Sequence, residues 1–278
     1  MLKLFKNSFK TTNDCIILAT PLILFLSILS WYFDYALKSI DNTSKLILAI
    51  VTIFIMGSGF AAAWIYMAKK TITLSRKIFV FDKDRAKALG YLIMSLPRGI
   101  GKLFLPIIGV ISIYALILIL MFSGIGFIVD KLAGTISLDF DITNIQTFLV
   151  SSDELLSEIK ELPKQDILII NYWYFLSVFG IALTTFITML WVPEIVYAEK
   201  NSFKALYYSV IKIFKNFKKS VILYLYISFL IVLITILNTL LMFNPILYFL
   251  VLMLYYYFLV YIVVLLFSYY EQTFIYSE

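Results

Sequence analysis

The sequence has no histidine, a single cysteine and few charged side chains. Without imidazole, histidine-based acid/base catalysis, Ser/His and Cys/His nucleophile pairs, and His-containing metal motifs are all excluded. Cys15 has no second cysteine to pair with, so an intrachain disulfide is excluded as well. Charged residues make up 14% of the chain and hydrophobic residues 62%, against about 25% and 45–50% in ordinary soluble domains. A soluble fold cannot bury so much apolar surface, so we expect a membrane protein.

Motifs of catalysis are also missing. The sequence contains no P-loop, no G-x-S-x-G, no H-E-x-x-H and no pair of carboxylates inside an apolar segment. Two Asp-x-Asp pairs, Asp82/Asp84 and Asp139/Asp141, offer oxygen ligands for a cation. Helix capping explains the first pair better, and loop solubility the second. We therefore predict a protein that is not an enzyme and has no cofactor or metal site.

Six apolar stretches are long enough to cross a bilayer, which requires roughly 20 residues each. They cover approximately residues 15–33, 46–68, 103–129, 167–192, 221–243 and 246–267. The first follows three lysines, as a signal peptide would, but it is longer than a usual signal core and no A-x-A-like cleavage site follows it. We interpret it as an uncleaved anchor. The predicted fold is all-α and polytopic, with six transmembrane helices.

Charged residues are sorted by the side of the membrane on which this topology places them. The side with both termini and residues 69–102 and 194–219 holds 18 of the 23 basic residues and 7 of the 17 acidic ones, a net charge of +11. The other side has a net charge of −5. The positive-inside rule then places both termini in the cytoplasm, in the cytoplasmic (inner) membrane of a bacterium. Because the charge is not gathered on one soluble face, we do not expect nucleic acid as a partner.

Residues 201–219 form a predicted amphipathic helix between the fourth and fifth spans. Its apolar residues recur at spacings of three and four: Phe203, Leu206, Val210, Ile213 and Phe217. Lysines occupy the other side: Lys204, Lys212, Lys215 and Lys219. A helix of this kind lies in the headgroup plane, with its lysines toward anionic phosphates. We predict that these four lysines contact lipid headgroups.

The chain divides into three predicted hairpin units within one integral membrane domain: about 1–70, 71–193 and 194–278. Each unit combines a basic lead-in with two spans, and all three start on the same side, so the repeats are parallel. The motif K-N-S-F-K occurs at both 6–10 and 200–204.

Two further helices are predicted outside the spans. The lead-in of the middle unit is a helix from Asp82 or Asp84 to Pro97, which a basic patch joins to the third span. An outer insertion at 130–166 contains a short helix that begins at a Ser151-x-x-Glu154 capping box and stops at Pro163.

Few polar residues fall inside the spans. Asn238 is the most polar, and Tyr255, Tyr256 and Tyr257 lie too deep in the last span for an interfacial aromatic belt. Interhelical hydrogen bonds account for these residues. The alternative, that they line the pocket of a channel or transporter for a small or amphipathic substrate, stays open. Small residues at 57–63 predict that another helix approaches the second span closely.

The stretch from Trp191 to Leu225 carries a resemblance. An acidic residue follows a span at Glu194, an Ala-Leu-x-x-Ser run covers 205–209, and a basic-Asn patch stands at 215–216. This order resembles a loose group of prokaryotic multi-span proteins that includes the membrane domain of glycerophosphoryl diester phosphodiesterases and related uncharacterised families. The resemblance implies a six-helix bundle with in-plane cytoplasmic helices. It implies no catalysis, because the chemistry of that family belongs to a separate soluble domain.

Together these features predict a non-enzymatic membrane protein that interacts with lipids, or that acts as a scaffold or an accessory to membrane transport. The expected partners are anionic lipid headgroups. A protein partner is compatible with the sequence, but no motif identifies one.

Overall fold

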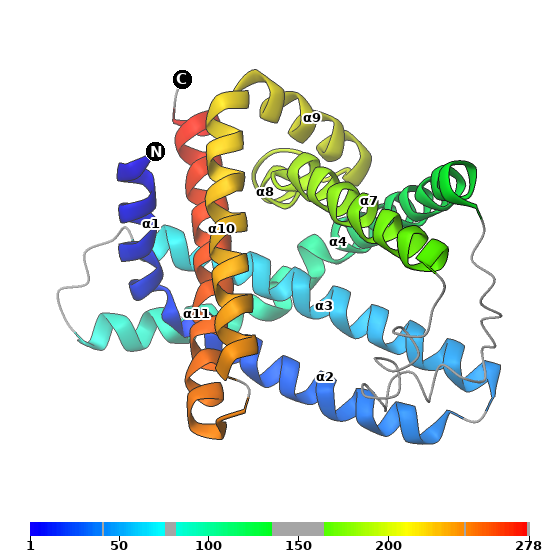
Figure 1. Cartoon of the computed structure of the whole chain (residues 1–278). Helices are drawn as coiled ribbons and strands as arrows, with labels where there is room; N and C mark the ends of the chain where they lie inside the picture. Colours follow the sequence, from blue (N-terminus) through cyan, green and yellow to red (C-terminus); the bar gives the residue numbers. More distant parts are fainter. Residues whose placement is uncertain (41, 76–81, 135–163, 242, 277–278) are drawn as a thin grey trace. The chain divides into compact units, whose positions relative to one another are not determined.

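A computed structural model describes residues 1–40, 42–75, 82–134, 164–241 and 243–276 (Figure 1). These residues are helical and contain no strand, so the all-α prediction is confirmed for the described part of the chain. The elements run in this order: α1 (Leu2–Asp14), η1 (Ile16–Leu18), α2 (Ala19–Ser39), α3 (Thr43–Ser75), α4 (Asp82–Ala133), α7 (Lys164–Thr188), α8 (Trp191–Tyr197), α9 (Ser202–Lys215), α10 (Phe217–Leu241), α11 (Pro245–Tyr270) and a π-helical turn, η3 (Glu271–Ile275).

Among the described residues, six helical segments are long and apolar enough to span a membrane, as predicted. They are Ile16–Ser39, Thr43–Leu74, Gly90–Ala133, Lys164–Tyr197, Phe217–Leu241 and Pro245–Ile275. Each contains one of the predicted spans or most of it. The helices extend beyond the apolar windows, so several of them carry polar residues at their ends.

The chain forms two compact units. The first unit comprises Met1–Ser112 and Phe186–Glu278, and the second comprises Ile113–Thr185. In the second unit, α4 packs against α7 around a small apolar core of Ile125, Val129 and Ile169. Gly180 makes this packing close, because a Cβ there would lie 2.7 Å from the sulfur of Met121.

In the first unit, α2 packs on α3, α10 packs on α11, and α1 lies along α11 (Figure 1). One apolar core joins α2, α3 and α11 around Trp64 and Phe267. A second core joins α1, α10 and α11 around Leu4 and Leu265. Phe5 of α1 stacks on Tyr226 of α10, with ring centroids 4.1 Å apart. The N-terminal segment is therefore an integral part of this unit.

The small residues of α3 meet a glycine of α4. A Cβ at Gly99 would lie 2.9 Å from Cα of Ala63 and 3.1 Å from the carbonyl oxygen of Ala62. Only glycine allows the two helices to approach this closely. The close approach predicted for the small residues of the second span is thus confirmed.

One predicted boundary is wrong. The middle lead-in does not stop at Pro97, because α4 continues from Asp82 to Ala133 through both Pro97 and Pro106. Proline removes one backbone donor, but it can remain in a helix whose neighbours satisfy the freed groups. The predicted outer helix after Ser151 lies outside the described residues.

Candidate functional site

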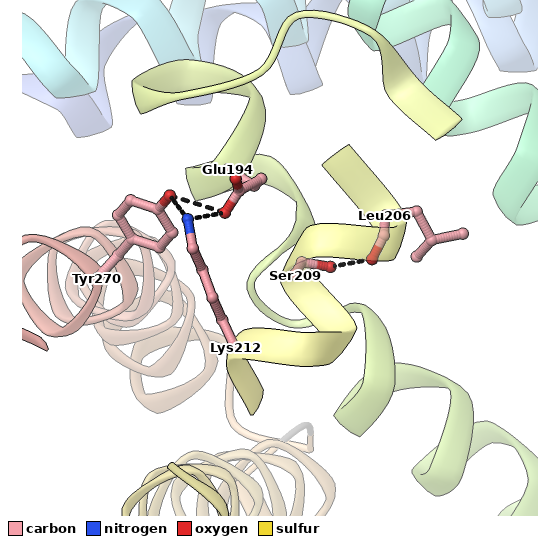
Figure 2. A network of polar contacts seen from close by, with 5 residues as sticks. All are labelled: Glu194, Leu206, Ser209, Lys212 and Tyr270. Carbon is pink, nitrogen blue, oxygen red and sulfur yellow. Dashed lines mark hydrogen bonds and ion pairs between the residues drawn. The ribbon is translucent and has the colours of Figure 1, made fainter. Parts of the chain in front are cut away.

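The junction of α8 and α9 contains two buried polar residues, Glu194 and Ser209. Asn201 begins α9, and its side chain accepts a hydrogen bond from the backbone N–H of Lys204 at 3.1 Å. Two small residues of α9, Ala205 and Ser209, are fully buried at the contact with the rest of the unit. The Ser209 hydroxyl donates to the carbonyl oxygen of Leu206 at 2.8 Å (Figure 2). A small, self-satisfied side chain at this position allows α9 to lie close against its neighbours.

The start of α9 is fastened to two other helices. The indole Nε1 of Trp191 donates to the carbonyl oxygen of Ser202 at 2.8 Å. The Ser202 hydroxyl donates to the carbonyl oxygen of Pro106 in α4, also at 2.8 Å. Gly109 leaves the space for this hydroxyl, because a Cβ there would collide with the Ser202 side chain.

A buried ion pair fastens the other end of α9. Lys212 Nζ donates to Glu194 Oε2 and to the hydroxyl oxygen of Tyr270, each at 2.7 Å, and the Tyr270 hydroxyl donates to the same Oε2 at 2.7 Å (Figure 2). The side chain of Glu194 is 2% exposed and that of Lys212 is 26% exposed. The carboxylate, the ammonium and the hydroxyl hydrogen-bond to one another in place of water. These hydrogen bonds join α8, α9 and α11.

Aromatic rings and a second lysine surround this ion pair. Tyr197 stacks on Tyr270, with ring centroids 5.6 Å apart and an interplanar angle of 20°. Lys69 Nζ donates to the carbonyl oxygen of Val196 at 2.7 Å and lies 4.4 Å from the centroid of the Tyr197 ring. The network thereby extends from α11 through α8 to α3.

The opposite side of α9 is exposed and aromatic. Phe203, Tyr207, Ile211 and Phe214 follow at spacings of four, four and three, and they are 69%, 64%, 45% and 57% exposed. At 100° per residue these four side chains form one sector of the helix, and Lys204 and Lys215 border it. We call this surface the aromatic face of α9.

The predicted apolar face is therefore only partly correct. Phe203 is exposed as expected, but Ile213 is 1% exposed and lies in the core of the first unit. The helix has two apolar sides, one against the protein and one facing outward. The sequence-based pattern combined residues of both.

The four predicted headgroup lysines divide in the same way. Lys204, Lys215 and Lys219 are exposed, and their assignment to lipid headgroups stays a prediction. The ammonium of Lys212 is bound to Glu194 and Tyr270 and is therefore not assigned to lipid headgroups. Its role in the structure is to hold α9 in place.

The residues of the predicted pocket do not converge. Asn238 is exposed on α10, Tyr255 is 42% exposed, and Tyr256 is buried in the core beside α2 and α3. The Tyr257 hydroxyl donates to Asn13 Oδ1 at 2.7 Å, an interhelical hydrogen bond of the expected kind. Four cavities of the first unit are lined by other described residues.

Glu194 is the residue whose role sequence reasoning missed. It follows the fourth predicted span in the sequence, yet its side chain is more deeply buried than that of its ion-pair partner Lys212. The only signal in the sequence is an acidic residue after a span with a lysine 18 positions later. Among the described residues, no three metal-ligating side chains gather into a cluster.

Of the residues that carry the resemblance stated above, Glu194, Ala205 and Ser209 are buried at the α8–α9 junction, whereas Lys215 of the basic-Asn patch is exposed. Compared with known proteins, the chain matches no family model, no curated protein and no solved structure.

Proposed function

We propose that this chain is a non-enzymatic multi-pass protein of a bacterial cytoplasmic membrane that binds anionic lipids at its basic end. In this role it organises lipids around itself, or supports a partner complex or a transport process. The observation that carries the proposal is the construction of α9. Both ends of this helix are fastened to the first unit, while its aromatic face and its bordering lysines are exposed.

A fastened amphipathic helix has the composition needed at a membrane surface. Aromatic rings insert at the level of the headgroups, and lysines beside them attract anionic phosphates, each lysine by about 1 kcal/mol. Lys218 and Lys219 in the first turn of α10 are also exposed and add to this charge. The aromatic face would be costly in bulk water, since it exposes four large apolar side chains in one sector.

The test replaces Lys204, Lys215 and Lys219 by Gln in the full chain. After reconstitution, electron paramagnetic resonance with spin-labelled phosphatidylglycerol and phosphatidylcholine gives the relative association of each lipid with the protein. The triple variant should lose most of the preference for phosphatidylglycerol. A matched control replaces Lys38, Lys45 and Lys131, which lie on the other side of the predicted topology, and should keep it. Equal preferences in the two variants would contradict the proposal.

The orientation in the membrane is part of the same proposal and rests on the charge difference between the two sides. Its test is cysteine labelling of intact cells with a membrane-impermeant maleimide, in a Cys15→Ser background. Lys38→Cys should react from outside the cell. Lys204→Cys should react only after the cells are permeabilised, and the reverse pattern would contradict the orientation.

A further inference from the structure

A basic cleft lies between α3, α4, α8 and the residues that follow α8. It is a cavity of about 270 Å³, and its lining includes the side chains of Lys69, Lys70, Lys102 and Lys200. No acidic residue is among its lining residues. In the described part of the chain, no carboxylate forms an ion pair with Lys70, Lys102 or Lys200, and of the cleft lysines Lys69 interacts electrostatically with the buried carboxylate of Glu271.

A neighbouring cavity extends the same charge. It has a volume of about 220 Å³, shares Tyr66, Lys70 and Thr73 with the basic cleft, and adds Arg98. The ring of Tyr66 lies under two of the ammonium groups, with Lys102 Nζ 5.6 Å and Lys70 Nζ 6.0 Å from its centroid. Cations that come from separate helices and converge on one hollow repel each other unless an anion lies between them.

The fold brings these cations together by close helix packing. Lys70 and Lys102 belong to different helices, and Gly99 lets α4 touch α3 at Ala63, two turns before Lys70. The Ser202 hydroxyl holds the start of α9 to α4, which keeps the nearby Lys200 beside the cleft. The convergence of Lys70 and Lys102 therefore follows from helix packing, and Lys200 joins them from the short connection between α8 and α9.

An apolar groove adjoins the cleft. It has a volume of about 430 Å³, and its lining from α2, α3, α8 and α11 is almost wholly aliphatic and aromatic, with Phe60, Trp64 and Ile65 on α3. Ile65 of the groove and Lys69 of the cleft stand one helical turn apart on α3. On α8, Pro193 lines the groove and Ile195 lines the cleft. A basic site and an apolar site thus follow each other along the same two helices.

We propose that the basic cleft binds the phosphate of an anionic phospholipid and that the adjoining groove holds one of its acyl chains. This inference rests on the proposed function and makes it specific. It adds a discrete lipid site of defined lining to the general lipid contact of α9. Lys70, Lys102 and Lys200 bind the phosphate oxygens, while Lys69 is also held by Val196 and Tyr197.

The experiment uses Trp64, which lines the groove, as the reporter. The full chain with Trp31→Phe and Trp173→Phe is reconstituted in phosphatidylcholine nanodiscs that contain a small fraction of phosphatidylglycerol brominated on its acyl chains. Bromine quenches tryptophan only at close range. Quenching should be strong with brominated phosphatidylglycerol and weak with the same fraction of brominated phosphatidylcholine, and a further Trp64→Phe substitution should abolish the difference.

Charge variants then separate this site from the face of α9. Replacement of Lys70, Lys102 and Lys200 by Gln should weaken the apparent affinity for the brominated lipid by roughly tenfold to 100-fold. The matching Arg variant should retain quenching, which also shows that the site still folds. The Lys204, Lys215 and Lys219 variant should retain it too, even if the general lipid preference is lost.

Three outcomes would overturn the inference. They are equal quenching by the two brominated lipids, unchanged quenching in the Gln variant of the cleft, and calorimetric binding of inorganic phosphate in detergent without any quenching by the lipid. The last outcome would assign the cleft to a soluble phosphate compound. A loss of lipid preference in the α9 variant with unchanged cleft behaviour would leave both proposals standing.

Discussion

Two ion pairs of this protein have the same length and different surroundings. Lys38 and Asp34, one turn apart in α2, are joined at 2.7 Å, as are Lys212 and Glu194. The side chains of the first pair are 74% and 64% exposed, whereas Glu194 is 2% exposed and shares its oxygen with Tyr270. The distance between charges therefore says little about the contribution of a pair. The contribution of a pair to stability depends on its burial and on further hydrogen bonds, such as that from Tyr270.

Lys212→Met is expected to have the largest effect of the substitutions that probe this comparison. It leaves the buried Glu194 carboxylate with a hydrogen bond from Tyr270 but without its cation, and the free energy of unfolding should fall by about 3 kcal/mol. Unfolding in mixed detergent and SDS micelles measures the change. Lys212→Arg keeps the charge and should lose less. A loss no greater than that of Lys38→Met would contradict the structural role of the buried pair.

Tyr270→Phe should have the next largest effect. It removes one hydroxyl that both accepts from Lys212 and donates to Glu194, but keeps the ring that stacks on Tyr197. A hydrogen bond to a buried charged group contributes about 1.5–3 kcal/mol, and the same unfolding measurement should show a loss in this range. The control is Tyr255→Phe, on the exposed side of α11, which should leave stability unchanged.

Replacing both members of the buried pair should cost less than replacing one. In the double variant Glu194→Met/Lys212→Met no charge is left unpaired, and stability should lie within about 1 kcal/mol of the wild type. A double-mutant cycle with the two single variants gives the coupling energy. If the double variant were as unstable as Lys212→Met alone, the network would depend on more than charge balance.

Lys38→Met should have the smallest effect. Exposed pairs one helical turn apart contribute about 0.3–0.5 kcal/mol, and salt screens them. Unfolding at low and high salt should therefore give nearly the same stability for this variant and the wild type. A loss of unfolding free energy as large as that of Lys212→Met would contradict this expectation and show that α2 depends on the Lys38–Asp34 ion pair.

Much of the fold could be predicted from the sequence because membrane spans depend on local composition. The six apolar stretches correspond to six long apolar helices among the described residues. The small residues of α3 predicted a close helix contact, although not that Gly99 would be the partner. Each of these features is read from a window of a few residues.

The site could not be predicted in the same way, because its partners are far apart in the chain. The Tyr270 hydroxyl meets Glu194 across 76 positions, and Lys69 meets Val196 across 127. The direction of the Lys212 side chain depends on which side of α9 packs on the protein. Both sides of α9 are apolar, so periodicity alone does not distinguish them. The continuation of α4 through Pro97 likewise depends on tertiary packing, which outweighs the local preference to stop.

The attachment of α9 at both ends has a mechanical consequence. Because α9 is hydrogen-bonded near both of its ends, it cannot bend away from the rest of the first unit. A force on its aromatic face is therefore transmitted to the contacts at the two ends. These contacts join Ser202 to the carbonyl oxygen of Pro106 in α4 at one end, and Lys212 to the hydroxyl of Tyr270 in α11 at the other. Lateral pressure in the lipid leaflet would thus reach two spanning segments at once, and α9 would serve as a strut between them.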